Sequence, residues 1–140
     1  MEVIIFTDGG SRGNPGIAGC GVVILDTKSK VLSEQSRGLG LATNNEAEYQ
    51  GVILALEWVV AQQWQKLDQI TFKLDSMLVV EQLSQKWRIK EPRLAILAGK
   101  IWQQLKTLPC SIKFCHIPRA QNSRADQLAN EAMDRGTINN

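Results

Sequence analysis

Two aspartates lie where predicted strands end, an arrangement that can bring carboxylates together. Asp8 follows the apolar run VIIF, and Asp75 closes the alternating segment ITFKLD. In open α/β sheets, ligand sites form at the carboxyl ends of the strands. If these two strands are neighbours, their carboxylates lie side by side, which is unfavourable unless one is protonated or a cation neutralises both.

A third acid, Asp126, lies in the first turn of a predicted helix that begins at Asn122. Acids at this position commonly compensate the helix dipole, so a structural role would explain Asp126 taken alone. Its place just after the last predicted strand puts it at the same sheet edge as Asp8 and Asp75. Three acids at one edge favour a functional cluster over three separate structural roles.

The fourth acid must be chosen between two glutamates in the segment TNNEAEY. Thr43 and Glu46 have the spacing of a capping box, in which the glutamate bonds back to the N–H of the cap residue. That pairing accounts for Glu46. Glu48 has no such local partner and can point at the sheet edge, so we expect Glu48 to be the fourth ligand.

Hydrophobic periodicity outlines the elements that position these acids. Unbroken or alternating apolar runs predict strands, and apolar residues at helical spacing predict helices. The polar turn DTKS joins the second and third strands as an antiparallel hairpin. Strands first, then alternating helices and strands, predict a mixed sheet flanked by helices. The predicted strands are residues 3–6, 19–25, 30–38, 70–75 and 111–117, and the predicted helices are residues 44–63, 77–83, 94–105 and a last one from 122.

The composition is that of an ordinary globular protein. Its 140 residues are 44% hydrophobic and 21% charged with a net charge of +2, which fits one domain over residues 1–140 with a polar tail at 136–140. Three cysteines without a C-x-x-C pair argue against a disulfide framework and a zinc site, and suit the cytoplasm. No apolar run approaches membrane-spanning length. We expect a monomer with no membrane partner.

Four motifs in this order resemble the type I ribonuclease H (ribonuclease HI) family over essentially the whole chain. The motifs are TDGGSRGNPG at Asp8, TNNEAEY at Glu48, LDS at Asp75 and NSRADQLAN at Asp126. The resemblance implies a ribonuclease H-like α/β fold, a five-stranded mixed sheet with its first three strands antiparallel. It also implies that these four acids are catalytic and hold two Mg²⁺ ions, with Mn²⁺ as a possible substitute. The implied reaction cuts the RNA strand of an RNA–DNA hybrid, leaving 5′-phosphate and 3′-hydroxyl ends.

The chemistry of the acids agrees with that implication. Mg²⁺ is a hard ion that takes oxygen ligands, including carboxylates, phosphate and water. Two ions ~4 Å apart can activate water and stabilise the leaving oxygen in an in-line attack on phosphate. Four acids supply the charge that two dications require.

The resemblance also implies residues that contact the substrate. Contacts near ribose 2′-hydroxyls fall around Gly10 and Ser11, and the 2′-hydroxyl separates RNA from DNA. We expect the glycines of the first motif to permit a tight turn and to let backbone approach a nucleic-acid strand closely. The other implied substrate contacts are Asn14 and Asn44 in the minor groove, Thr43 at a DNA phosphate, and Met77 near the RNA strand.

The chain departs from the family after its second helix. Many members carry a lysine-rich extra helix there, whereas this chain has only KWRIKEPR. Trp87 is either the aromatic of a DNA-strand channel or a core residue between helices. Lys86, Arg88 and Lys90 are either residual phosphate contacts or a solvated face.

A second departure concerns histidine. Many members place one in a glycine-rich loop before the last aspartate, and here that loop is PRAQN. The one histidine, His116, falls on the same predicted strand face as Ile112 and Phe114, so we expect it to pack against helices. Arg119 then becomes the candidate catalytic residue of the loop.

Two other functions compete with this one. An integrase-like or resolvase-like nuclease would use similar acids, but such families lack the TNN-x-x-E helix start and the glycine-rich turn. An inactive binding or tethering domain would be expected to have lost a carboxylate, and all four are present. The sequence therefore favours a hybrid-specific, metal-dependent endoribonuclease.

Overall fold

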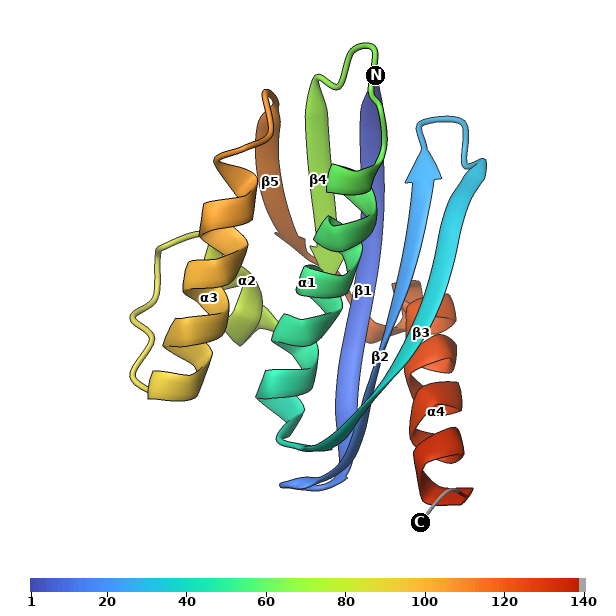
Figure 1. Ribbon diagram of the computed structural model, residues 1–140, viewed down its shortest axis with the longest axis vertical. Helices are drawn as coiled ribbons and strands as arrows, with labels where there is room; N and C mark the ends of the chain where they lie inside the picture. The colour runs from blue at the N-terminus through green and yellow to red at the C-terminus, as the bar shows by residue number, and fades with distance from the viewer. Residues whose placement is uncertain (139–140) are drawn as a thin grey trace.

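The computed structural model describes residues 1–138 (Figure 1). Five strands form one sheet, and helices cover both of its faces. The strands are β1 (Glu2–Gly13), β2 (Gly16–Asp26), β3 (Val31–Ala42), β4 (Gln69–Leu74) and β5 (Ser111–His116). The helices are α1 (Asn44–Ala61), α2 (Met77–Leu83), α3 (Pro92–Leu105), the short 3₁₀ helix η1 (Arg119–Gln121) and α4 (Ser123–Ile138).

The sheet has the mixed topology that the sequence predicts. Its strand order is β3-β2-β1-β4-β5. β1 pairs antiparallel with β2, and β2 pairs antiparallel with β3, whereas β4 lies parallel to both β1 and β5. The prediction of three antiparallel strands followed by parallel ones is confirmed.

Strand β2 shows why helices are needed on both faces. Cys20, Val22 and Ile24 are fully buried in the main core, to which α1 also contributes. Val23, between them, points to the other face and packs with Ala125 of α4. Figure 1 shows this division, with α1, α2 and α3 on one side of the sheet and α4 on the other. Because strand side chains alternate between faces, a strand that is apolar on both must be covered twice.

Helix α1 begins with the predicted capping box. The N–H of Glu46 donates to Oγ1 of Thr43 at 3.1 Å, and the N–H of Thr43 donates to Oε1 of Glu46 at 3.2 Å. The helix ends at Ala61, two residues before the predicted boundary, where Gln62 adopts an extended backbone. The local role assigned to Glu46 is therefore confirmed.

Strand β1 is longer than predicted, and Asp8 lies within it rather than at its end. The parallel ladder with β4 stops at Phe6, but the antiparallel ladder with β2 continues to Gly13. The glycine-rich second half of the strand has no hydrophobic alternation, so its pairing was not visible in the sequence. The turn into β2 is confined to the two residues between Gly13 and Gly16.

Helix α4 also extends further than predicted. It runs through Ile138, so residues 136–138 of the predicted polar tail are helical, while residues 139–140 lie outside the described part of the chain. Among residues 1–138, no helix combines the length and apolarity that crossing a membrane requires.

Candidate active site

The parallel pairing of β1 and β4 places Asp8 beside Asp75. The ladder between the two strands ends at the pair Phe6 and Lys73, and each aspartate lies two residues beyond that pair. The two carboxylates therefore leave neighbouring strands at the same level and on equivalent sides. The expectation that these strands are neighbours is confirmed.

Gly9 lets α1 pack closely against β1 beside these two aspartates. A Cβ at Gly9 would lie 2.2 Å from the backbone oxygen of Ala47, so any other residue would push the first turns of α1 away from β1. Glu48 follows Ala47 and reaches the same place as the two aspartates. Oxygen atoms of Asp8, Glu48 and Asp75 all lie within 4.8 Å of one another. Gly9 thus serves helix packing and lies within β1 rather than in the tight turn that the sequence suggested, while the approach of a nucleic-acid strand stays a prediction.

Burial makes this trio costly without a cation. Asp8 is 7% exposed and Glu48 is 8% exposed. Burial, then the charge of Asp75 and a hydrogen bond with Asp126, raise the pKa of Asp8 to about 8. Burial and then the charge of Asp8 raise the pKa of Glu48 well above its usual range. Like charges held in a buried site disfavour ionisation unless a cation neutralises them.

The oxygen atoms available also suit a hard cation. Within residues 1–138, Oε2 of Glu48 is buried and has no hydrogen-bond partner. A buried acceptor without a partner costs free energy, and a bound ion would satisfy it. The acid cluster therefore could hold a metal ion of the kind that prefers oxygen ligands.

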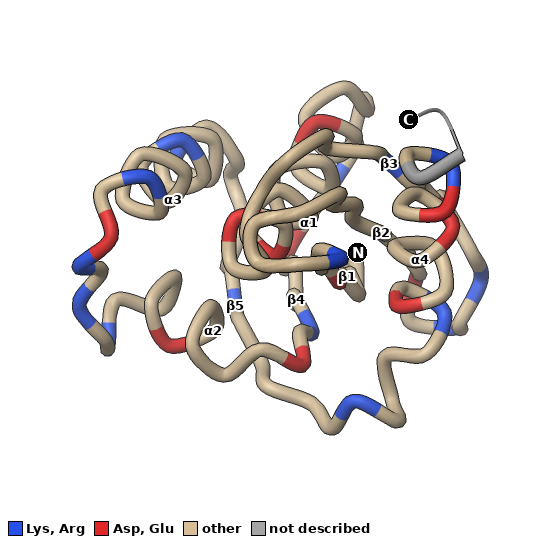
Figure 2. Tube along the Cα trace, turned by 90° about the horizontal axis from the view of Figure 1, so that it is seen from below, with Lys and Arg blue, Asp and Glu red and all other residues tan. Residues whose placement is uncertain are grey.

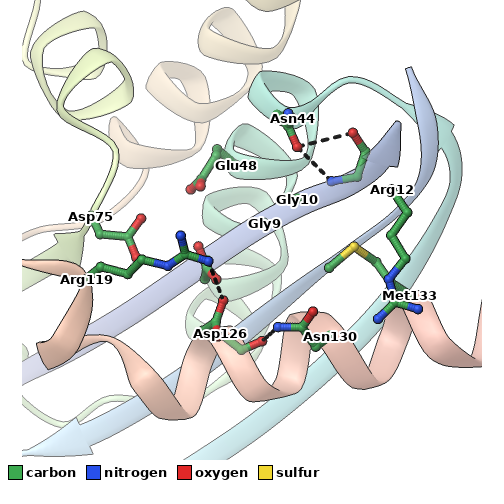
Figure 3. A pocket seen from close by; sticks show the side chains of 12 residues that line it. Gly9, Gly10, Arg12, Asn44, Glu48, Asp75, Arg119, Asp126, Asn130 and Met133 are labelled. Carbon is green, nitrogen blue, oxygen red and sulfur yellow. Dashed lines mark hydrogen bonds and ion pairs between the residues drawn. The ribbon is translucent and has the colours of Figure 1, made fainter. Parts of the chain in front are cut away.

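Asp126 approaches the trio from the other face of the sheet. It lies in the first turn of α4 and is near enough to Asp8 to raise the pKa of that carboxyl, although it falls outside the group whose oxygens meet within 4.8 Å. Arg119, from η1, extends over this side, and its Nη2 lies 3.8 Å from Oδ1 of Asp126 (Figure 3). The Arg119 side chain is 83% exposed, so it can reach a group bound above the acids.

The acids open into a hollow of about 480 Å³. Three of its lining residues were not identified as site candidates from the sequence. Two of them occupy ordinary helical positions on α4, and the third is a charged residue on β1. Figure 3 shows these side chains around the hollow. The additional lining residues are Arg12, Asn130 and Met133, which join Gly10, Ser11, Asn44, Arg119 and the four acids.

Hydrogen bonds connect three residues that the resemblance assigns to the substrate. The N–H of Ser11 donates to Oδ1 of Asn44 at 2.8 Å, and the N–H of Asn44 donates to Oδ1 of Asn14 at 3.0 Å. Asn14 and Thr43 also line an adjoining hollow of about 530 Å³. These hydrogen bonds hold the polar groups together, with Ser11 and Asn44 in the hollow of the acids and Asn14 in the second hollow.

Met77 and Trp87 are both exposed. Met77 begins α2, two residues after Asp75, and is 49% exposed. Trp87, between α2 and α3, is 46% exposed, so the alternative of a core tryptophan is wrong. Figure 2 shows a run of Lys and Arg along the same segment.

His116 is exposed, and the prediction that it packs against helices is wrong. It is the last residue of β5, which is an edge strand of the sheet. Ile112 and Phe114 are half-buried on this strand. Strand alternation predicts which face a side chain takes, but it does not reveal where the covering helices stop.

Comparison with known proteins agrees with this geometry. The family described as "Reverse transcriptase-like" matches residues 6–132. A bifunctional protein of Mycobacterium tuberculosis (strain ATCC 25618 / H37Rv) is 44% identical over 140 residues, covering 96% of this chain and 36% of that protein. Ribonuclease HI of Halobacterium salinarum is 40% identical over 133 residues, covering 95% of this chain and 65% of that protein. The chain thus spans about a third of the longer relative.

Solved structures extend the agreement to the backbone. The crystal structure of LC11-RNase H1 in complex with an RNA/DNA hybrid superposes with a TM-score of 0.91 at 43% identity, covering 96% of this chain and 99% of that one. This match and the family match over residues 6–132 cover the strands and helices that carry the acid cluster. On that evidence, the chain belongs to the ribonuclease H family.

Proposed function

We propose that this chain is an endoribonuclease that hydrolyses the RNA strand of RNA–DNA hybrids, leaving 5′-phosphate and 3′-hydroxyl ends. The observation that carries the proposal is the meeting of three carboxylates within 4.8 Å just beyond the end of the parallel β1–β4 ladder of a ribonuclease H sheet. A relative that shares 43% identity was crystallised with such a hybrid, which supports the same substrate here.

The acids would hold two divalent ions, with Mg²⁺ as the preferred ion and Mn²⁺ as a substitute. Asp8, Glu48 and Asp75 supply the buried oxygens, and Asp126 supplies a further carboxylate at the rim. When bound, such a pair of ions activates water and stabilises the leaving oxygen of a phosphodiester. The chain itself contributes the fixed positions of these carboxylates and their low exposure to water, which strengthens their attraction to a cation.

Arg119 and the polar surface around Asn44 would hold the substrate. Arg119 carries a guanidinium charge beside Asp126 and can neutralise a phosphate oxygen there. Gly10 and Ser11 line the hollow beside the acids, where a ribose 2′-hydroxyl would distinguish RNA from DNA. Asn14 and Asn44 would lie in the minor groove and Thr43 at a DNA phosphate, while Met77 and Trp87 would contact the strands from the α2 side.

The protein would act as a monomer in the cytoplasm. The acids and the other residues that line the hollow all come from one chain. Cys20, Cys110 and Cys115 are free thiols, which suits a reducing compartment.

A cleavage assay tests this function directly. Labelled RNA–DNA, RNA–RNA and DNA–DNA duplexes are incubated with the protein in Mg²⁺, in Mn²⁺ and in EDTA. We expect cleavage of only the RNA strand of the hybrid, and only with a divalent ion. Asp75→Asn is the matched control and should be inactive while still binding the hybrid. Cleavage in EDTA, or equal cleavage of DNA–DNA, would refute the proposal.

A further inference from the structure

A buried asparagine just before α4 contacts the segments that carry three of the four acids. Asn122 is 1% exposed. Its Nδ2 donates to the backbone oxygen of Thr7 at 2.8 Å and to Oδ2 of Asp75 at 3.2 Å. Its backbone oxygen accepts the N–H of Asp126 at 3.0 Å. Thr7 directly precedes Asp8, so this one residue connects β1, the end of β4 and the start of α4.

The chemistry of the amide suits the orientation of a carboxylate. A side-chain NH₂ has two donors, and the two acceptors use both, which fixes the rotation of the group. The bond to Oδ2 of Asp75 restricts the carboxylate to one orientation and leaves Oδ1 outside this contact. Because Asn122 is neutral, it orients Asp75 without cancelling the negative charge that a cation needs. A lysine or arginine at this place would compete with the cation.

A purely structural role explains only part of this arrangement. The bonds to Thr7 and from Asp126 would anchor α4 on the sheet without any contact to Asp75. In addition, Oδ1 of Asn122 is buried without a partner in the described part of the chain. An unpaired buried acceptor lowers stability, so the placement of the amide does not maximise the stability of the fold.

We propose that Asn122 is a positioning residue that holds Asp75 and the first turn of α4 in register with Asp8. The acids are then arranged before a divalent ion binds. Asn122 acts through Asp75 and touches neither the substrate nor the reacting atoms. The inference rests on the metal-dependent function proposed above. Hydrogen-bond partners behind metal ligands typically change affinity or activity by roughly 10–100-fold when they are removed.

Asn122→Leu tests this proposal because leucine keeps the shape and burial but removes the donor. Thr71→Val is the matched control. Thr71 is also buried and lies in β4 at the end away from Asp75, where its Oγ1 donates to Glu2 at 3.1 Å. Both variants lose one buried polar group, and only Asn122→Leu loses a contact with one of the four acids of the cluster. The melting temperature of each variant measures the shared structural cost.

Two readouts separate positioning from stability. The first is binding of Mn²⁺ alone, without nucleic acid, followed by the electron paramagnetic resonance signal of the free ion. The second is the division of hybrid cleavage into kcat and KM. We expect Asn122→Leu to weaken Mn²⁺ binding roughly tenfold or more and to lower kcat roughly 10–100-fold. The KM for the hybrid should change less than about threefold, and Thr71→Val should match the wild type in both readouts.

The contrary result is a lower melting temperature for Asn122→Leu with wild-type Mn²⁺ affinity and kcat, which would reduce Asn122 to a structural residue. If Asn122→Leu does not fold, Asn122→Ser gives the same decision, since its hydroxyl is too short to bridge Thr7 and Asp75. A wild-type protein that binds Mn²⁺ but does not cleave the hybrid would refute the proposed function. The Mn²⁺ measurement would still decide the role of Asn122.

Discussion

At the scale of single residues, two glutamates two positions apart have different tasks. Glu46 closes the capping box of α1, and Glu48 meets the aspartates. Glu48→Gln should therefore abolish cleavage at near-native stability, because it removes a charge from the cluster and keeps the shape. Glu46→Ala should remain active and lose ~1 kcal/mol of stability. Cleavage rates and chemical denaturation of both variants check this, and the reverse pattern would move the site to Glu46.

The raised pKa of Asp8 makes the stability of the metal-free protein depend on pH. Burial and the neighbouring acids raise this pKa from 3.8 to about 8. Below pH 3.8 the Asp8 carboxyl is protonated in both the folded and the unfolded protein, so its ionisation does not lower the free energy of unfolding. As pH rises from 3.8 to 8, the unfolded state releases the proton first, so folding loses free energy. A group with a raised pKa thus stabilises the protein at low pH, and that contribution is lost through pH 8.

Asp8→Asn removes this titration and should stabilise the metal-free protein. We expect its melting temperature in EDTA to exceed that of the wild type by several degrees at pH 8, where ~1 kcal/mol corresponds to ~3 °C. The difference should shrink towards zero near pH 4. Added Mg²⁺ should raise the melting temperature of the wild type more than that of Asp8→Asn. A difference that is the same at both pH values would show that repulsion is not its cause.

At the scale of the elements, η1 carries the least expected part of the site. Arg119 begins this short helix and extends towards Asp126, while His116 ends β5 three residues earlier and is exposed. Arginine can neutralise phosphate but does not titrate near neutral pH. Arg119→Ala should lower kcat roughly tenfold, equal to ~1.4 kcal/mol in the transition state.

His116→Ala is the matched control for Arg119→Ala, since it changes an exposed residue on the same connection. We expect it to keep wild-type turnover and wild-type stability. The pH–rate profile of the wild type should show no limb near ~6.5 that disappears with the histidine. Loss of both such a limb and turnover in His116→Ala would make His116 the catalytic residue of this connection.

The elements also show what the sequence could predict. The capping box depends on local spacing, so the separate tasks of Glu46 and Glu48 could be predicted from neighbouring residues alone. The meeting of Asp8 and Asp75 required in addition that β1 and β4 be neighbours, which no local pattern reveals. The length of β1, the exposure of His116 and the close packing at Gly9 depend on partners far away in the chain. In the sequence, Asn122 was only the first residue of the last predicted helix. Its contacts with Thr7 and Asp75 appear only once three elements converge.

At the scale of the whole molecule, substrate binding depends on where the cations lie. The net charge of +2 is too small to attract nucleic acid from a distance. The segment between α2 and α3 nevertheless presents Lys86, Arg88 and Lys90, all exposed (Figure 2). Within residues 1–138, none of these three forms an ion pair with an acid. They are therefore available for phosphates near Trp87.

Hybrid binding should accordingly be weak and strongly dependent on salt. Each phosphate contact releases counterions, so log Kd should rise with log salt by ~0.9 for every cation engaged. Replacing Lys86, Arg88 and Lys90 with alanine should reduce this slope by ~2–3 and weaken binding at low salt. A matched triple variant replaces three other exposed lysines, Lys28 and Lys30 between β2 and β3 and Lys106 just after α3, and should keep the wild-type slope. Equal slopes in both triple variants would show that the segment between α2 and α3 does not contact the hybrid and that Arg12, Arg93 and Arg119 supply the phosphate contacts instead.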